Sequence, residues 1–205
     1  RVAMTQSPNS LLPTQDQPSQ RGPAPLSPLH GAPAPYAPGL TASVSFVLNG
    51  RRVDRVVDVR DNLADLLRRE FGLLSVKKGC EVGECGACTV LIDGESIDTC
   101  IYLAVWAEGK DIRTTEGLAS PEGDLSVVQQ AFVDATAVQC GFCTPGLVMT
   151  ATELVESGEH YSRDELRKEI AGHLCRCTGY ENIVTAVQLA LQRDEEARAA
   201  EPSRG

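Results

Sequence analysis

Alternating apolar and polar residues predict a strand pair and a helix in the first ordered part of the chain. Residues 43–48 alternate in this way, and residues 51–59 alternate again after the dipeptide Asn49-Gly50. Alternation turns one face of each strand toward a core, and Asn-Gly is a strong signal for a type I′ hairpin turn. Asp61 is then predicted to cap a helix. Leucines follow it at helical spacing, and Gly72 is predicted to end the helix. A hairpin followed by a helix is therefore expected.

Further short strands follow a loop that is rich in glycine and cysteine. The loop covers residues 79–88 and leads into an apolar strand over residues 89–92. Asp93-Gly94 predicts a tight turn, residues 96–99 a returning strand, and residues 110–115 a last strand. Together with the hairpin and the helix, these strands predict a small α+β sheet domain.

The second half of the chain is predicted to be helical, because each of four segments begins with a capping signal. Capping boxes or N-caps are expected at Ser126, Thr144, Ser162 and Thr178. The second of these helices has Pro145 at its first position and ends near Gly158, as helix start and stop preferences favour. The third carries apolar residues at intervals of four as far as Leu174. Four such helices suggest a compact bundle.

Composition divides the chain into five parts. Residues 1–40 hold nine of the twelve prolines, and such a segment buries too little apolar surface to offset its ordering entropy. We expect a disordered tail there, with an arm that wraps a partner subunit as the alternative. Residues 117–124 combine Gly, Pro, Ser and acidic residues and predict a linker. The sheet domain is then expected over 41–116, the helical domain over 125–193, and a frayed, charged tail over 194–205.

Charge and hydropathy exclude several classes of protein. The net charge of -9 argues against nucleic-acid binding, in which Lys and Arg must neutralise phosphates. No stretch approaches the ~18 apolar residues that a membrane-spanning helix needs, and no charged segment followed by an apolar one suggests a secretory signal. We therefore expect a cytoplasmic protein, in whose reducing surroundings clustered cysteines are more often metal ligands than disulfides.

The first set of cysteines has the spacing of a plant-type [2Fe–2S] loop. Its members are separated by four, two and eleven residues. Three cysteines on one short loop must all point inward, so the backbone wraps around the inorganic sulfurs and its N–H groups can bond to them. Glycines at 79, 83 and 86 permit the positive φ angles and close approach that this requires. The predicted ligands are Cys80, Cys85, Cys88 and Cys100.

The second set has a less diagnostic spacing but an internal repeat. Cys140 and Cys143 form a C-x2-C pair, and Cys175 and Cys177 form a C-x-C pair. In each half a Cys-Thr pair stands before a predicted helix. Helix N-termini carry partial positive charge, which would stabilise a cluster whose net charge is about -2 oxidised and -3 reduced. A second [2Fe–2S] cluster between two halves of a pseudo-twofold helical domain is expected.

Three other uses of the cysteines have less support. A structural zinc site also takes four thiolates, disulfides need an oxidising compartment, and a catalytic thiol needs a basic partner. The histidines are His30, His160 and His173, and the last is expected to be structural because four cysteines already complete each set. The sequence has no dinucleotide fingerprint, no phosphate-binding loop and no Ser/His/Asp arrangement. No catalytic residue is assigned, and the chain is expected to move electrons between other sites.

Two long motifs resemble those of the molybdenum hydroxylases. Residues 79–90, GCEVGECGACTV, are similar to the ferredoxin-loop signature of this family. Residues 139–146, QCGFCTPG, and residues 174–180, LCRCTGY, resemble its second signature. The resemblance covers residues 44–191, and residues 100–109, CIYLAVWAEG, are most similar to the separate iron–sulfur subunit of bacterial xanthine dehydrogenases.

The resemblance implies a β-grasp, plant-type ferredoxin-like domain followed by a four-helix [2Fe–2S]-binding bundle, within a hetero-oligomer. It implies a large partner subunit with molybdopterin and a medium partner subunit with FAD, between which this chain carries electrons. The helical-domain cluster would lie next to the pterin and the ferredoxin-like cluster toward FAD. Gln139 and Cys177 match positions that contact the pterin, although Gln139 is also explained as a polar residue at a helix end. His173 stands where the family often has Asn.

Three alternatives of function stay open at this point. The chain resembles iron–sulfur subunits of other molybdenum hydroxylases as well, including those that oxidise aldehydes or carbon monoxide. A free two-cluster redox carrier, or a zinc-stabilised interaction module, is a weaker possibility. Neither a substrate nor a final electron acceptor follows from these residues.

Overall fold

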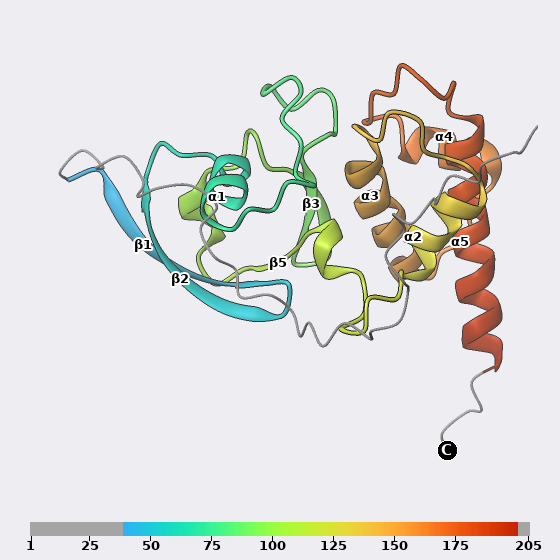
Figure 1. The fold of residues 1–205 in the computed structure, drawn as a ribbon, viewed down its shortest axis with the longest axis horizontal. Coiled ribbons are helices and arrows are strands. Elements are labelled where there is room, and N and C mark those ends of the chain that lie inside the picture. Colours follow the sequence, from blue (N-terminus) through green and yellow to red (C-terminus); the bar gives the residue numbers. More distant parts are fainter. Residues whose placement is uncertain (1–38, 201–205) are drawn as a thin grey trace, which may run out of the picture.

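A five-stranded mixed sheet forms the first half of the computed structural model, which describes residues 39–200 (Figure 1). The strand order is β2-β1-β5-β3-β4. β1 pairs antiparallel with β2 and parallel with β5, while β3 pairs antiparallel with both β4 and β5. The strands are β1 Thr41–Leu48, β2 Arg51–Asp58, β3 Thr89–Ile92, β4 Glu95–Asp98 and β5 Asp111–Arg113. The predicted α+β class is confirmed.

Both predicted hairpin turns are present, and their backbone angles explain their sequences. Asn49 has φ 49° and Gly50 has φ 76°, while Asp93 has φ 53° and Gly94 has φ 93°. A two-residue type I′ turn needs positive φ at both central positions, which Asn, Asp and Gly adopt most readily. The registers of β1 with β2 and of β3 with β4 are thus set locally at these two turns.

A helix packs on the sheet and closes its core. α1 covers Leu63–Glu70, and the 3-10 helices η1 and η2 cover Ala104–Ala107 and Thr115–Gly117. The α1 cap is Asn62, whose side chain accepts from the N–H of Asp65 at 2.8 Å, so the expected cap at Asp61 was wrong by one residue. Asp61 instead pairs with a later arginine of the helix. The largest fully buried side chains of this core are Phe46, Leu48, Leu63, Leu66, Leu67 and Ile112.

Four helices make up the second half, as predicted. They are α2 Val127–Asp134, α3 Thr144–Ser157, α4 Arg163–Glu169 and α5 Glu181–Ala200. The capping boxes at Ser126 and Ser162 are both formed, with the reciprocal side-chain and backbone hydrogen bonds that define them. Gly158 ends α3 in the left-handed conformation at φ 69°. These helices enclose a second hydrophobic core, separate from that of the sheet.

The other helix limits differ from the prediction. α3 is capped by Cys143 rather than Thr144, and α5 begins three residues beyond Thr178. α4 stops before it reaches Leu174, whose side chain is exposed. α5 continues to Ala200, through part of the segment that was expected to fray. The rest of that tail and residues 1–38 of the Pro-rich segment lie outside the described residues.

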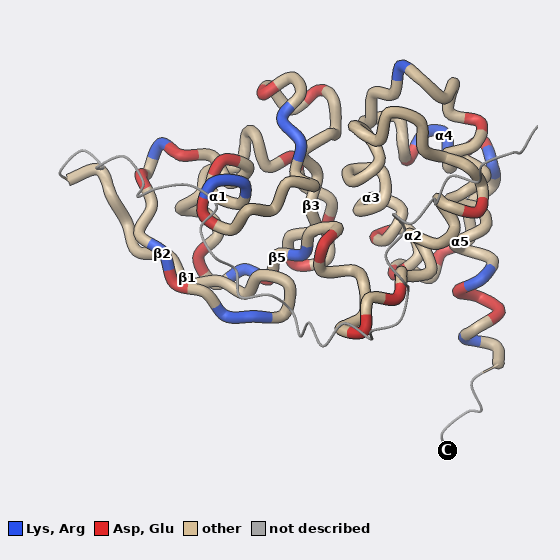
Figure 2. Tube along the Cα trace, in the orientation of Figure 1, with Lys and Arg blue, Asp and Glu red and all other residues tan. Residues whose placement is uncertain are grey.

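The two halves meet where α3 packs against β3 and β4 (Figure 1). The backbone N–H of Ser96 donates to Glu153 at 3.1 Å, and Arg113 forms an ion pair with Glu156. Acidic and basic residues are interspersed along most of the chain (Figure 2). Among the described residues, no helix has both the length and the apolar character to cross a membrane.

Candidate metal centres

The first cysteine loop lies between α1 and β3, where it projects from the sheet (Figure 1). Gly83 and Gly86 have φ angles of 76° and 66°, so both use the conformation that glycine adopts at little cost. Gly79 serves a different need, because a Cβ there would lie 2.9 Å from the sulfur of Cys85. The three glycines therefore let the loop turn tightly and let its backbone approach a sulfur.

The backbone of this loop directs N–H groups at a sulfur atom. The N–H groups of Val82 and Glu84 donate to Cys80 Sγ at 3.4 and 3.3 Å. These bonds lower the pKa of the Cys80 thiol to about 7. Since the thiolate is the form that ligates metal, the loop favours the ligand form of this residue.

The other two cysteines of the set are buried at the base of the loop. Cys88 and Cys100 are 2% and 8% exposed, and burial raises the pKa of the Cys88 thiol to about 12. The hydroxyl of Thr99 donates to the carbonyl of Cys88 at 2.7 Å and fixes the backbone between the two. A coordinating metal deprotonates such a thiol outright, so this pair suits a bound metal better than free thiolates.

The second set lies at the start of α3 and in the segment before α5. Cys143 is the N-cap of α3 and is buried, which raises its pKa to about 12. Burial also raises the pKa of Cys175, but hydrogen bonds from Thr178 outweigh it and the pKa falls to about 7. The repeat predicted from the sequence thus holds for Cys143, at a helix N-terminus, but not for Cys177, which stands four residues before α5.

Tyr180 holds this segment in place and was missed by the sequence reasoning. Its hydroxyl accepts from the N–H of Cys175 at 2.8 Å and donates to the carbonyl of His173 at 3.0 Å. Tyr180 itself has φ 69°, and its N–H donates to the hydroxyl of Thr178 at 3.1 Å. It is the last residue of the LCRCTGY motif, so the motif carried a signal that the spacing of the cysteines did not.

The thiols of each set interact with one another. In the first set Cys80 interacts with Cys85, and Cys88 with Cys100. In the second set Cys140 interacts with both Cys175 and Cys177, and Cys143 with both Cys140 and Cys175. Each half supplies four free cysteines, which is the donor set that a [2Fe–2S] cluster takes, with two cysteines on each iron.

One backbone hydrogen bond links the two sets. The N–H of Leu174 donates to the carbonyl of Cys85 at 3.1 Å, so a ligand candidate of the first set contacts the neighbour of Cys175 in the second. Gly146 lies at the same junction, where a Cβ would stand 2.1 Å from the carbonyl oxygen of Gly86. A short path therefore joins the two sets. It consists of the hydrogen bond from Leu174 to Cys85 and the backbone between Leu174 and Cys175.

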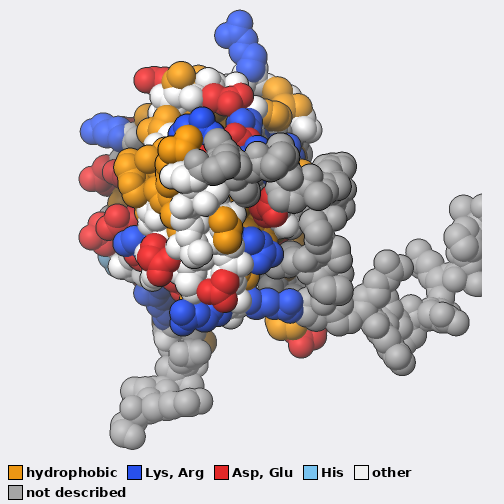
Figure 3. Space-filling view, turned by 90° about the vertical axis from the view of Figure 1, so that its left-hand side faces the viewer, with side chains coloured by type: hydrophobic (Ala, Val, Ile, Leu, Met, Phe, Trp, Pro, Cys, Tyr) orange, Lys and Arg blue, Asp and Glu red, His pale blue; other side chains and the backbone are white. Residues whose placement is uncertain are grey.

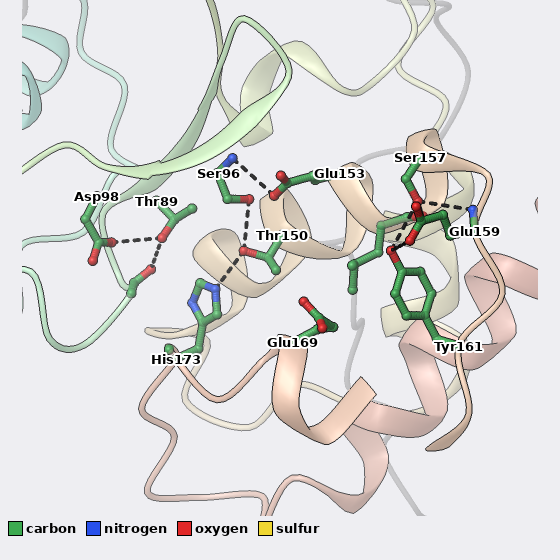
Figure 4. A pocket seen from close by; sticks show the side chains of 13 residues that line it. Thr89, Ser96, Asp98, Thr150, Glu153, Ser157, Glu159, Tyr161, Glu169 and His173 are labelled. Atoms are coloured by element: carbon green, nitrogen blue, oxygen red, sulfur yellow. Dashed lines mark hydrogen bonds between the residues drawn. The ribbon is translucent and has the colours of Figure 1, made fainter. Parts of the chain in front are cut away.

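His173 and a polar cavity complete the junction (Figure 4). The His173 ring is buried, which lowers its pKa, and its Nε2 lies 2.8 Å from the hydroxyl of Thr150 on α3. This structural role agrees with the sequence-based expectation. The adjoining cavity, of about 450 Å³, is lined by polar groups from both halves, including Asp98, Glu153 and Tyr161.

The residues expected to meet a pterin lie on the surface. Gln139 and Cys177 are exposed, as is Cys140, which interacts with Cys177. This edge of the second set is therefore open to a partner, while Cys143 faces the core of the helical half.

Comparisons with known proteins agree with this geometry. The family described as "2Fe-2S iron-sulfur cluster binding domain" matches residues 46–118, and "[2Fe-2S] binding domain" matches residues 114–188. A xanthine dehydrogenase iron-sulfur-binding subunit of Escherichia coli O157:H7 is 53% identical, over 72% of this chain and 92% of that protein. Caffeine dehydrogenase subunit gamma of Pseudomonas sp. (strain CBB1) is 47% identical, over 77% and 96%.

A solved structure extends the likeness to the fold. In quinoline 2-oxidoreductase from Pseudomonas putida 86, one chain is 44% identical and superposes with a TM-score of 0.73, over 80% of this chain and all of that one. The two family matches account for two [2Fe–2S] clusters, one in each half. The chain therefore belongs to the molybdenum hydroxylase family, as an iron–sulfur subunit that carries two [2Fe–2S] clusters.

Proposed function

We propose that the chain passes electrons from a molybdopterin site on one partner subunit to FAD on another, in a xanthine dehydrogenase-like hydroxylase complex. When bound, each [2Fe–2S] cluster supplies one-electron chemistry. The chain itself carries out no substrate chemistry in this proposal. The observation that carries it is the presence of two four-cysteine sets in one chain, joined by the hydrogen bond between Leu174 and Cys85, with Cys140 and Cys177 of the second set exposed.

The proposed ligands are the eight cysteines of the two sets. Four cysteines in each half match the ligand number of a [2Fe–2S] cluster, which supports two irons in each site. Ligands of the flavin-side cluster are Cys80, Cys85, Cys88 and Cys100, and ligands of the pterin-side cluster are Cys140, Cys143, Cys175 and Cys177. Family resemblance supports placing the first cluster toward FAD and the second toward the pterin. The exposed edge of the second set is consistent with this placement.

Gln139 and Cys177 are proposed to contact the pterin. Both are exposed, and the thiol of Cys177 interacts with that of Cys140. A partner that covers this edge would meet the amide of Gln139 and a cluster ligand together. The amide can both donate and accept hydrogen bonds, which suits the ring nitrogens and carbonyl of a pterin.

Exposed apolar side chains beside both loops support two partner interfaces. Val82 and Ile101 are 64% and 58% exposed at the first loop, and Phe142 is 46% exposed at the second. Further apolar side chains gather on the sheet end of the molecule (Figure 3). Trp106 of η1, which contacts β1 and β2, is 55% exposed. Exposed apolar groups of this kind mark interaction surfaces, which favours a subunit of a hetero-oligomer over a free carrier.

The choice of xanthine dehydrogenase rests on similarity. The xanthine dehydrogenase subunit is 53% identical over nearly its whole length. The second candidate is a complex for another substrate, because the caffeine dehydrogenase subunit is 47% identical. In both cases the substrate would be recognised by the molybdopterin subunit. We place the complex in the cytoplasm, since free thiols gathered in metal-binding sets suit a reducing compartment.

The first test is the metal content of the anaerobically purified chain. We expect about four irons and four acid-labile sulfides, as two [2Fe–2S] clusters require, and two distinct EPR signals after reduction with dithionite. Zinc without sulfide would refute the electron-transfer function. Size-exclusion chromatography of the complex from its native host, followed by analysis for molybdopterin and FAD, separates a subunit from a free carrier.

The second test places single substitutions in the assembled complex. Cys143→Ser should abolish electron flow from substrate to flavin, and Cys88→Ser should remove the first EPR signal while the second persists. Thr144→Ser, in the same turn as Cys143, is the matched control and should keep both signals. Full substrate-to-flavin transfer in Cys143→Ser would contradict the ligand assignment.

A further inference from the structure

A carboxylate lies against one sulfur of the first cysteine set. Asp98 ends β4, and its Oδ1 is 3.6 Å from Cys88 Sγ. The buried hydroxyl of Thr89 lies 3.0 Å from the same oxygen and 2.8 Å from the carbonyl oxygen of Gly86, and it shares its one proton between these two acceptors (Figure 4). Thr89 is only 7% exposed and lies on β3, so the carboxylate is held at the sulfur by a rigid element of the sheet.

The two ends of the first set therefore have opposite electrostatic surroundings. Cys80 receives two backbone N–H groups, which stabilise negative charge on its sulfur. Cys88 is buried and has the negatively charged oxygen of Asp98 beside it. Once Cys88 binds iron as a thiolate it has no proton to share with Asp98, so the contact becomes one between two like charges.

Asp98 lies at a polar cavity rather than in an ion pair. The residue lines the polar cavity between the halves, in which water can hydrate a carboxylate. Among the ion pairs of the described residues, none includes Asp98. His173, the basic side chain among the residues that line this cavity, is buried, and this burial lowers its pKa and favours its neutral form.

We propose that Asp98 lowers the reduction potential of the first cluster. Asp98 thereby sets the difference in reduction potential between the two clusters. The inference rests on the proposed function, because it requires Cys88 to be a ligand. Reduction adds one electron and takes the net charge of the cluster from about -2 to about -3. A fixed negative charge at the sulfur opposes that electron more than it opposes the oxidised state, without any bond or proton changing hands.

The test is an EPR-monitored redox titration of the purified subunit at pH 8. Asp98→Asn removes the charge and keeps the shape of the side chain. We expect the one-electron equilibrium of the first cluster to shift at least tenfold toward the reduced form, a rise of about 59 mV. Glu95→Gln is the matched control, since it removes the same charge at the other end of β4, ~10 Å away at strand spacing, and Asp98→Glu should restore the low potential.

The second cluster serves as an internal reference, with its signal identified from its loss in Cys143→Ser. An unchanged first potential in Asp98→Asn, or an equal shift in Glu95→Gln, would overturn the proposal. If Asp98→Asn does not load its cluster, Asp98→Ala loses the same charge and carries the same expected rise. Absence of both signals from the wild-type chain would instead refute the proposed function, so the two failures are distinguishable.

Discussion

Gly146→Ala tests the junction between the two halves most directly. Gly146 is buried in the first turn of α3, and a Cβ there would lie 2.1 Å from the carbonyl oxygen of Gly86. Real Cβ contacts are essentially never shorter than 3.0 Å. The obstacle is a backbone atom within the first cysteine loop, so α3 and the loop must separate by about 0.9 Å to accept the methyl group.

Two opposing free energies decide the size of the effect. Alanine favours a helix by ~1 kcal/mol over glycine, and this alone would stabilise α3. Overpacking a rigid contact costs ~1–3 kcal/mol, occasionally more, and the clash with a backbone oxygen lies at the upper end. We expect a net loss of ~1–2 kcal/mol in the free energy of unfolding, which lowers the melting temperature by roughly 2–8 °C for a chain of this size.

The separation of α3 from the loop should also weaken the hydrogen bond that links the two cysteine sets. The bond from Leu174 to Cys85 is 3.1 Å long and adjoins Gly86, so an added 0.9 Å would stretch it beyond hydrogen-bonding distance. We therefore expect slower electron exchange between the clusters and weaker magnetic coupling between their reduced signals. Thermal melting and EPR of the loaded subunit measure the two effects independently.

Gly172→Ala is the matched control for this substitution. Gly172 lies in the same junction, but nothing lies within 4 Å of the position that a Cβ would take, so stability and coupling should stay at wild-type values. If Gly146→Ala had the same melting temperature and the same magnetic coupling between clusters as Gly172→Ala, the close contact between Gly86 and Gly146 could not be what holds the halves together.

Three further predictions concern the helices and the metal. Ser162→Ala removes one side of the capping box with Glu165 and should cost ~1 kcal/mol in denaturant unfolding; an unchanged midpoint would mean that α4 contributes nothing to the cooperative unit. Arg198→Ala removes the guanidinium that donates to the carbonyl of Val155 at the end of α3 and should cost ~0.5–1 kcal/mol, whereas Arg198→Lys should recover part of it. Removal of iron by a chelator should lower the melting temperature and raise hydrogen exchange first in residues 79–88, and equal exchange with and without iron would argue against cluster binding by that loop.

Local signals in the sequence were sufficient for much of the fold. Asn49-Gly50 and Asp93-Gly94 specify their turns because few other dipeptides adopt positive φ twice. Ser126 and Ser162 specify helix starts because each meets a partner three residues later. The fold class and the presence of two cysteine sets followed from such patterns, all of which act within a few residues. The domain boundaries and the individual ligands stay predictions.

The errors occurred where neighbouring residues competed for one role. Asp61 and Asn62 are both good caps, and only the path of the chain decides that Asn62 faces the helix. Thr178 bonds to the N–H of Tyr180 instead of starting a helix. α5 extends beyond its expected end because the guanidinium of Arg198 donates to the carbonyl of Val155 on α3. The periodicity of residues along α5 cannot predict this contact with another helix.

The sequence by itself determined which residues can bind metal, since cysteine chemistry and spacing are written along the chain. The tertiary structure decided how they are grouped and what surrounds them. The approach of Cys88 to Cys100, the bond from Leu174 to Cys85 and the carboxylate of Asp98 beside Cys88 all depend on segments brought together by folding. No local pattern encodes such contacts, because each joins segments far apart in the chain, which the packing of β3, β4 and α3 and the two hydrophobic cores brings together.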